Sequence, residues 1–275
     1  MRKLFNGFVL LATVFAACNG SDKTGETDGE PVSYAPSLVP YSVTGTLPHD
    51  TLYFTEGLEY YNGILYESSG PGGSEDYLSS AYPSAFGTVN MQTGKVTNKV
   101  ELEKATHFAE GITFFKDKVY HLTYKNKIGY VFDAKTFKKI REFNLPSAEG
   151  WGLTHDSSSI IMSDGTSKLY FLHPDSLTTR HILTVTDNMG EVPSINELEY
   201  INGFIYANKW GTNHILKIDA QSGKVIGMLD FSKKAAEAAQ QYPRLNEMNG
   251  IAYDSTTGTM LVTGKNWPVI YKVRL

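Results

Sequence analysis

Short runs of alternating hydrophobic and polar residues fill most of the chain beyond about residue 37, and five of these runs begin with similar segments. Alternation with a period of two is typical of β-strands with one buried face. The five segments are 54–58, 108–112, 150–153, 196–200 and 248–252. Aligning Gly57, Gly111, Gly152, Glu197 and Gly250, which we call the anchors, gives successive spacings of 54, 41, 45 and 53 residues. Such spacings are typical of propeller repeats.

Each anchor is followed by the same order of strands and turns. In the first repeat, residues 57–60 and 64–69 flank a turn at Tyr61-Asn62-Gly63, which predicts a β-hairpin. A third and a fourth strand follow in most repeats, with turns such as Thr93-Gly94-Lys95 between them. Residues 37–275 therefore predict an all-β fold, a five-bladed β-propeller of four-stranded antiparallel blades with about 48 residues per blade.

The last repeat supplies only three strands before the chain ends at Leu275. Residues 40–47 precede the first anchor and are predicted to supply the missing outer strand, which would close the ring and remove an open sheet edge. Two insertions lengthen the regular blades, at residues 70–83 and 231–244. The second is rich in alanine and lysine and predicts a helix, with Ser232 available as its N-cap.

The N-terminal segment resembles a bacterial export signal. Arg2 and Lys3 precede an apolar stretch at 8–17, which is too short to span a bilayer. Phe15-Ala16-Ala17-Cys18 resembles a lipobox, which implies a signal peptide at 1–17 and lipidation of Cys18. Residues 18–36 have the composition of a flexible tether. We therefore expect an exported protein held by its lipid on a bacterial membrane, with plain secretion as the alternative.

Composition removes several classes of function. The net charge of −4 gives no basic surface for nucleic acid. Cys18 is the single cysteine, so neither an internal disulfide nor a cysteine-based site is possible. Motifs of serine hydrolases, zinc proteases and nucleotide-binding proteins are missing, and the seven histidines lack metal-ligand spacing.

Polar residues at the anchors are the candidates for a site, because the first strand of each blade lines the central channel of a propeller. These residues are Glu56, Glu110, Asn196, Glu197 and Asn249. For Glu197 and Asn249, we favour a structural role, either bonding to backbone groups or holding a channel ion such as Ca²⁺. Trp151, Trp210 and Trp267 lie beside an anchor or after a second strand, where they are expected to wall a pocket.

Several segments together resemble the glutamine cyclotransferase family, the plant and bacterial type of glutaminyl-peptide cyclotransferase, which is a five-bladed propeller. The segments span nearly all of residues 41–275: 54–58, 108–111, 150–153, 163–166, 196–203, 207–210, 249–252 and 263–268. The resemblance implies conversion of an N-terminal glutamine of peptides or proteins to pyroglutamate, with loss of ammonia and without a catalytic metal. It also implies that no cofactor is required.

The resemblance also assigns roles to individual residues. Glu110 matches the catalytic glutamate, which would accept a proton from the substrate amine and deliver it to the leaving nitrogen. Asn196 and Lys265 match further catalytic positions. The matching substrate-binding positions are Phe54, Glu56, Phe108, Tyr124, Trp151, Trp210 and Trp267.

Two of these positions depart from the family pattern. Glu56 stands where glutamine is expected, and Tyr124 stands where tryptophan is expected. A second carboxylate beside Glu110 would raise the pKa of Glu110 or bind the substrate ammonium group.

Two other functions remain open from the sequence. The first is a calcium-dependent propeller hydrolase, such as a lactonase, with Ca²⁺ held by Glu56, Glu197 and Asn249. The second is a non-catalytic propeller that binds a partner at its mouth. In each case we expect a monomer that contacts the membrane only through its lipid.

Overall fold

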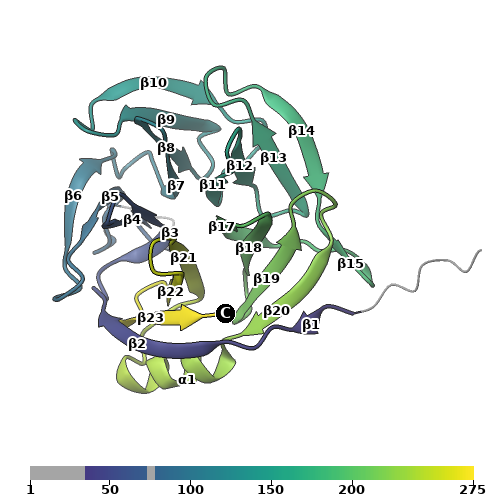
Figure 1. Cartoon of the computed structure of the whole chain (residues 1–275). Helices are drawn as coiled ribbons and strands as arrows, with labels where there is room; N and C mark the ends of the chain where they lie inside the picture. The colour runs from purple at the N-terminus through teal and green to yellow at the C-terminus, as the bar shows by residue number, and fades with distance from the viewer. Residues whose placement is uncertain (1–34, 73–77) are drawn as a thin grey trace, which may run out of the picture. The chain divides into compact units, whose positions relative to one another are not determined.

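Five sheets follow one another around a ring in the computed structural model, which describes residues 35–72 and 78–275 (Figure 1). Each sheet contains a blade of four antiparallel strands, which confirms the predicted all-β, five-bladed propeller. The predicted signal peptide, Cys18 and most of the predicted tether lie outside the described residues.

Blades 1 to 4 each run in chain order between an inner and an outer strand. Blade 1 consists of β3 (Phe54–Tyr61), β4 (Ile64–Gly70), β5 (Ala85–Val89) and β6 (Val96–Glu101). Blade 2 consists of β7 (Ala109–Phe115), β8 (Lys118–Thr123), β9 (Ile128–Asp133) and β10 (Lys139–Asn144). Blade 3 consists of β11 (Leu153–His155), β12 (Ile160–Ser163), β13 (Lys168–Leu172) and β14 (Thr179–Thr184). Blade 4 consists of β17 (Ile195–Ile201), β18 (Phe204–Lys209), β19 (His214–Asp219) and β20 (Val225–Asp230).

Blade 5 joins the two ends of the propeller. Its first three strands, from the inside outward, are β21 (Met248–Asp254), β22 (Thr259–Gly264) and β23 (Val269–Arg274). The outer strand is β2 (Ser42–Pro48), which pairs antiparallel with β23. The prediction that the N-terminal strand closes the ring is therefore confirmed. A short β1 (Ser37–Leu38) pairs parallel with β20, and β15 (Thr186–Asp187) and β16 (Gly190–Glu191) form a small separate hairpin.

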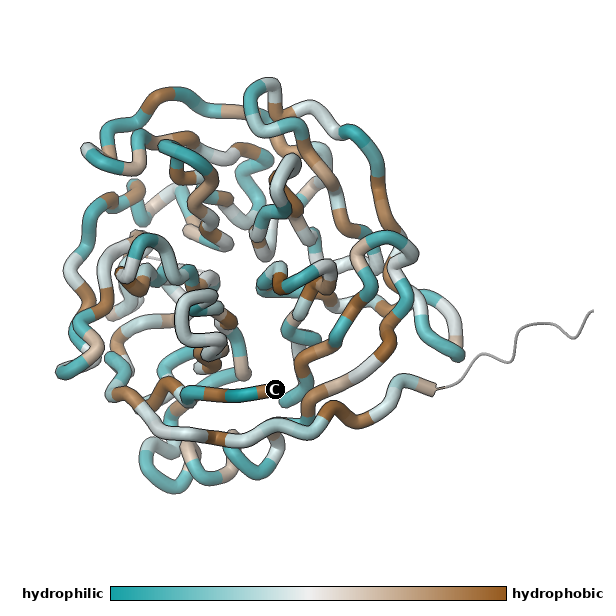
Figure 2. The backbone as a smooth tube through the Cα atoms, in the orientation of Figure 1, coloured by the Kyte–Doolittle hydropathy of each residue, from teal (hydrophilic) through white to brown (hydrophobic). Residues whose placement is uncertain are grey.

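The hydrophobic core lies between blades. Five clusters of buried residues each combine side chains from two neighbouring blades, and together they cover all five junctions of the ring. Figure 2 shows the corresponding mixture of hydrophobic and hydrophilic positions along the strands. Because burial of apolar surface is the main favourable term in folding, the ring is stabilised at every junction.

The predicted helix is present as α1 (Ser232–Gln241), but Ser232 is not its N-cap. Phe231 occupies that position without a side-chain cap, and the Asp230 carboxylate accepts a hydrogen bond from the Ser232 N–H at 2.8 Å. An acceptor one residue before the cap position therefore satisfies a free donor of the first turn. Ala235 and Ala238 pack this helix against the junction of blades 4 and 5. Across the described ranges, no helix is long and apolar enough to cross a membrane.

Four of the five inner strands carry a register shift at their anchor. The shifts lie between Thr55 and Gly57, Ala109 and Ile112, Ile195 and Leu198, and Met248 and Ile251. A β-bulge leaves a residue outside the ladder and redirects its side chain. The bulges therefore explain why Glu56, Glu110 and Asn196 leave the regular alternation.

The anchor glycines let neighbouring inner strands touch. A Cβ atom at Gly152 would lie 2.2 Å from the Asn196 carbonyl oxygen on the next blade, so no side chain fits at this contact. Glu197 is the only anchor that is not glycine, and its carboxylate accepts backbone N–H bonds from Leu58 and Ile251 at 3.1 and 2.8 Å. Glu197 therefore ties blade 4 to blades 1 and 5.

Candidate active site

A cavity of about 340 Å³ collects nearly all of the predicted site residues. Its volume falls within the usual range for small-molecule sites. Trp267 is the one predicted catalytic or substrate-binding residue that does not line it, the structural candidates Glu197 and Asn249 do not line it either, and Glu247 is an additional lining residue. The lining residues are Phe54, Glu56, Phe108, Glu110, Tyr124, Trp151, Asn196, Trp210, Glu247 and Lys265.

A buried ion pair forms one side of the cavity floor. The Lys265 ammonium lies 2.8 Å from Glu56 Oε1, and both side chains are almost fully buried. Asn249 Nδ2 donates to Glu56 Oε2 at 3.3 Å, and the Lys265 ammonium lies 4.5 Å from the centre of the Phe54 ring. Burial raises the pKa of Glu56 to about 7, although Lys265 opposes this shift. Glu56 is therefore held by two donors from blade 5.

Glu110 lies beside this ion pair and is only 5% exposed. Burial raises its pKa well above the usual range, and the neighbouring Glu56 carboxyl raises the pKa further. The interaction between the two carboxyl side chains raises the pKa of Glu110 and lowers that of Glu56. Burial and the Glu56 carboxyl therefore both favour the protonated form of Glu110. Ser68 Oγ donates to the Glu110 carbonyl oxygen at 2.5 Å and fixes the bulge from blade 1.

A continuous row of aromatic side chains forms one wall of the cavity, beginning at Phe54 next to the ion pair. Successive ring centres from Phe54 through Phe108, Tyr124 and Trp151 to Trp210 lie 6.4, 5.6, 6.4 and 6.0 Å apart. Such spacings are typical of interacting aromatic pairs. Gly165, with φ of 77°, leaves room for Trp151, because a Cβ atom there would lie 2.6 Å from the indole. The 163–166 segment therefore shapes this wall.

Asn196 lines the cavity and has an amide oxygen that the protein itself does not use. The residue is 3% exposed, and its Oδ1 atom has no hydrogen-bond partner. A buried polar atom without a partner costs free energy unless a ligand or water satisfies it. The Trp151 indole, in contrast, donates to Glu149 Oε2 at 3.0 Å and is not available to a ligand in this arrangement.

The prediction that Trp267 walls the pocket is not supported by the structure. Its side chain is fully buried at the junction of blades 4 and 5, and its indole N–H donates to the Asn246 carbonyl oxygen at 2.9 Å. The segment between β20 and β21 supplies that carbonyl and the α1 side chains of the same cluster. Trp210 has no such cover and remains 47% exposed at the cavity.

Glu197 and Asn249 bond to the protein itself. Both carboxylate oxygens of Glu197 accept backbone N–H bonds, and Asn249 Nδ2 donates to the Thr55 carbonyl oxygen at 3.0 Å. Within residues 35–72 and 78–275, no group of three or more His, Cys, Asp or Glu side chains is arranged to hold a metal ion. These hydrogen bonds support the structural role, bonding to backbone groups, that the sequence favoured for Glu197 and Asn249.

Glu247 is the site residue that sequence reasoning missed. It lies three residues before the anchor Gly250, as Phe54 and Phe108 lie three residues before theirs. Glu149 holds the same position before Gly152. Comparison of this position across the repeats would have pointed to both glutamates as neighbours of the wall aromatics.

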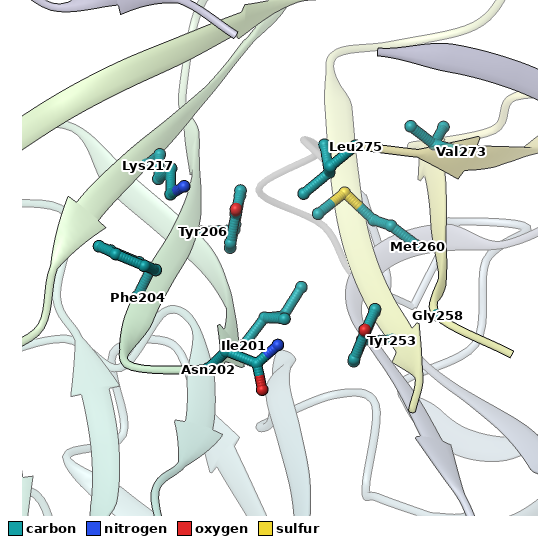
Figure 3. A pocket seen from close by; sticks show the side chains of 10 residues that line it. All are labelled: Ile201, Asn202, Phe204, Tyr206, Lys217, Tyr253, Gly258, Met260, Val273 and Leu275. Atoms are coloured by element: carbon teal, nitrogen blue, oxygen red, sulfur yellow. The ribbon is translucent and has the colours of Figure 1, made fainter. Parts of the chain in front are cut away.

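A second cavity, of about 250 Å³, lies at the other end of β17, at the junction of blades 4 and 5 (Figure 3). Ile201 and Asn202 border it, whereas Asn196 is near the start of the same strand. Lys217 lies over the Phe204 ring at 4.2 Å, and Met260 and Tyr253 come from blade 5. No predicted site residue reaches this cavity.

Comparisons with known proteins agree on one family. The glutamine cyclotransferase family model matches residues 9–275. A glutaminyl-peptide cyclotransferase from Arabidopsis thaliana is 32% identical over 282 residues, which cover 100% of this chain and 84% of the relative. The crystal structure of Myxococcus xanthus glutaminyl cyclase matches with a TM-score of 0.76 and 29% identity, over 87% of this chain and 97% of that one.

Proposed function

This chain belongs to the glutamine cyclotransferase family, and we infer that it is a glutaminyl-peptide cyclotransferase that converts N-terminal glutamine to pyroglutamate with release of ammonia. The observation that best supports this activity is that a buried carboxyl, Glu110, and the unpartnered amide oxygen of Asn196 line the same aromatic pocket. The pocket is formed within a single chain, so we propose that a monomer is active.

The reaction joins two parts of one residue. The α-nitrogen of the substrate bonds to its own γ-carboxamide carbon, the bond from that carbon to the amide nitrogen breaks, and ammonia leaves. Overall, one proton moves from the α-nitrogen to the leaving nitrogen. Because the side chain must fold back on the amine, the enclosed aromatic wall supplies orientation, which can contribute a large share of rate acceleration.

We assign the proton transfer to Glu110. Its raised pKa gives the resting enzyme a protonated acid, which donates to the leaving nitrogen and then accepts a proton from the attacking α-nitrogen. The substrate amine, with an ordinary pKa of about 7.7 to 8.0, is partly neutral at physiological pH and able to attack. Glu56 and Lys265 hold each other and thereby fix the position of Glu110.

We assign recognition of the side chain to Asn196. An asparagine amide beside a glutamine amide can accept one N–H through Oδ1 and donate one through Nδ2, which satisfies the orphaned oxygen. A glutamate side chain lacks the N–H donors for this pairing when ionised. A site with an unpaired buried polar group rejects such an analogue strongly.

Ammonia release tests the activity directly. We expect the purified protein to release ammonia from a glutaminyl dipeptide between roughly pH 6 and 9, which brackets the ordinary α-amine pKa. Dipeptides that begin with glutamate or asparagine are expected to be inert, since the first has no leaving amide and the second has a shorter side chain. Absence of ammonia release from the glutaminyl dipeptide would disprove the assignment.

A chelator serves as the control for the calcium-dependent alternative. Exhaustive treatment with EDTA is expected to leave the rate unchanged, because the proposed proton transfer and amide recognition use side chains alone. Loss of activity that returns with Ca²⁺ would favour the lactonase-like chemistry. No turnover under any condition would favour the non-catalytic binding propeller.

We also propose that the protein is exported and held to a membrane by a lipid on Cys18. The support is the sequence alone: the apolar segment at 8–17 and the lipobox-like residues before the cysteine. Replacing Cys18 with alanine is expected to move the protein from the membrane fraction to the soluble fraction of bacterial cells. An equal membrane share for the variant and the parent, measured by quantitative blotting, would contradict the proposal.

A further inference from the structure

The cavity has a clear order of depth. Glu56, Glu110, Asn196 and Lys265 are buried at its floor, whereas Glu247 is half-buried and Trp210 is exposed. On the proposed function, on which this inference rests, the reacting glutamine occupies the floor. The second residue of the peptide must then lie closer to the cavity entrance, among less buried lining residues such as Glu247 and Trp210.

Glu247 is held in place beside the floor by its backbone. The Lys265 N–H donates to the Glu247 carbonyl oxygen at 2.9 Å, and the Asn246 N–H donates to the Lys265 carbonyl oxygen at 2.9 Å. The Glu247 side chain lines the cavity, and its charge acts on both Glu56 and Lys265. The two backbone hydrogen bonds, which resemble those between paired strands, therefore fix the position of Glu247.

Other charged groups in the cavity or next to its lining residues have partners. Lys265 pairs with Glu56, and Glu149 at the equivalent repeat position accepts from the Trp151 indole and lies 3.9 Å from the Lys125 ammonium. The Glu247 carboxylate makes neither a hydrogen bond nor an ion pair within the described part of the chain. An unmatched carboxylate in a confined, aromatic-lined cavity attracts a cation more strongly than one in open water.

We propose that Glu247 is a specificity-determining residue that favours substrates with lysine or arginine directly after the N-terminal glutamine. The unpartnered Asn196 amide in the same cavity independently marks the floor as a place for a ligand. Lysine and arginine combine a cation with an apolar stem, so they suit a cavity that is lined by a carboxylate and by aromatic side chains such as Trp210 and Phe54. A glutamate at the second position would meet repulsion from Glu247.

The test uses three peptides that differ only in their second residue: Gln-Lys-Ala, Gln-Ala-Ala and Gln-Glu-Ala, all amidated. In the wild type we expect kcat/KM to fall in that order, with a lysine-to-glutamate ratio of about tenfold or more at low salt. The ratio is expected to shrink at high salt, because ions screen a half-exposed charge. Glu247→Gln is expected to bring the ratio close to one, and Glu247→Lys to invert it.

The control is Glu142→Gln on the outer strand β10, where the same change removes an exposed carboxylate that pairs with Lys139 and does not line the cavity. This variant is expected to keep the wild-type ratio. Equal rates on the three peptides, a ratio that survives Glu247→Gln, or an equal loss on all three peptides would each overturn the inference while leaving the cyclase activity established. Failure of the wild type on Gln-Ala-Ala would instead overturn the proposed function.

Discussion

Replacing Glu110 with glutamine is expected to abolish ammonia release and to leave the fold intact. The amide has nearly the same shape as the carboxyl and is neutral like its protonated form, but it cannot give up a proton and take another. Removing a positioned acid and base typically costs roughly 10²- to 10⁴-fold in rate. Turnover of a saturating glutaminyl dipeptide, measured as ammonia, checks the prediction.

The pH dependence of stability provides a control that the fold and the site are intact. A carboxyl whose pKa is raised in the folded state contributes its full stability below the unfolded pKa, and that stability is lost as pH rises through the folded value. Glu110 is such a group, because burial raises its pKa. The Glu110→Gln variant is therefore expected to gain in Tm relative to the wild type as pH rises from about 5 to 8, a range that starts just above the ordinary glutamate value. Near-normal turnover in this variant would remove Glu110 from the proton transfer.

The repeat structure was predictable because each repeat has its own short sequence pattern. Each anchor combines a glycine or carboxylate with the start of an apolar strand, and closure follows from counting strands at the two ends. The same repeats predicted that Glu56, Glu110 and Asn196 converge, since inner strands of a propeller share one channel. The structure adds the reason, which is that bulges at the anchors turn these side chains out of the ladder.

The contacts that could not be predicted join residues far apart in sequence. Lys265 and Glu56 are 209 residues apart, and nothing in either segment shows that the ammonium pairs with Glu56. Trp210 and Trp267 each follow a second strand, yet the insertion that contains α1 buries only the second. Glu247 was missed because the equivalent positions of the other repeats hold different residue types, Phe54, Phe108, Glu149 and Ser194, so no shared residue type marks the position.

Loss of the Lys265 charge is expected to have the largest effect on stability. In Lys265→Met, the apolar stem still fills the space beneath Phe54, but Glu56 is left buried without its cation. Removing one partner of a buried pair typically costs about 3 to 5 kcal/mol. Urea unfolding at pH 8.5 is the measurement, and turnover is expected to fall as well, because Glu56 no longer holds Glu110 in one position.

Two comparisons separate this cause from simple loss of packing. At pH 5.5, below the Glu56 pKa of about 7, the folded wild type already holds Glu56 mainly protonated, so the penalty in Lys265→Met is expected to be smaller than at pH 8.5. In the double variant Glu56→Gln with Lys265→Met, no unpaired charge remains, and most of the lost stability is expected to return. A penalty that is the same at both pH values and persists in the double variant would show that Lys265 contributes by packing. The ion pair would then have no part in holding Glu110.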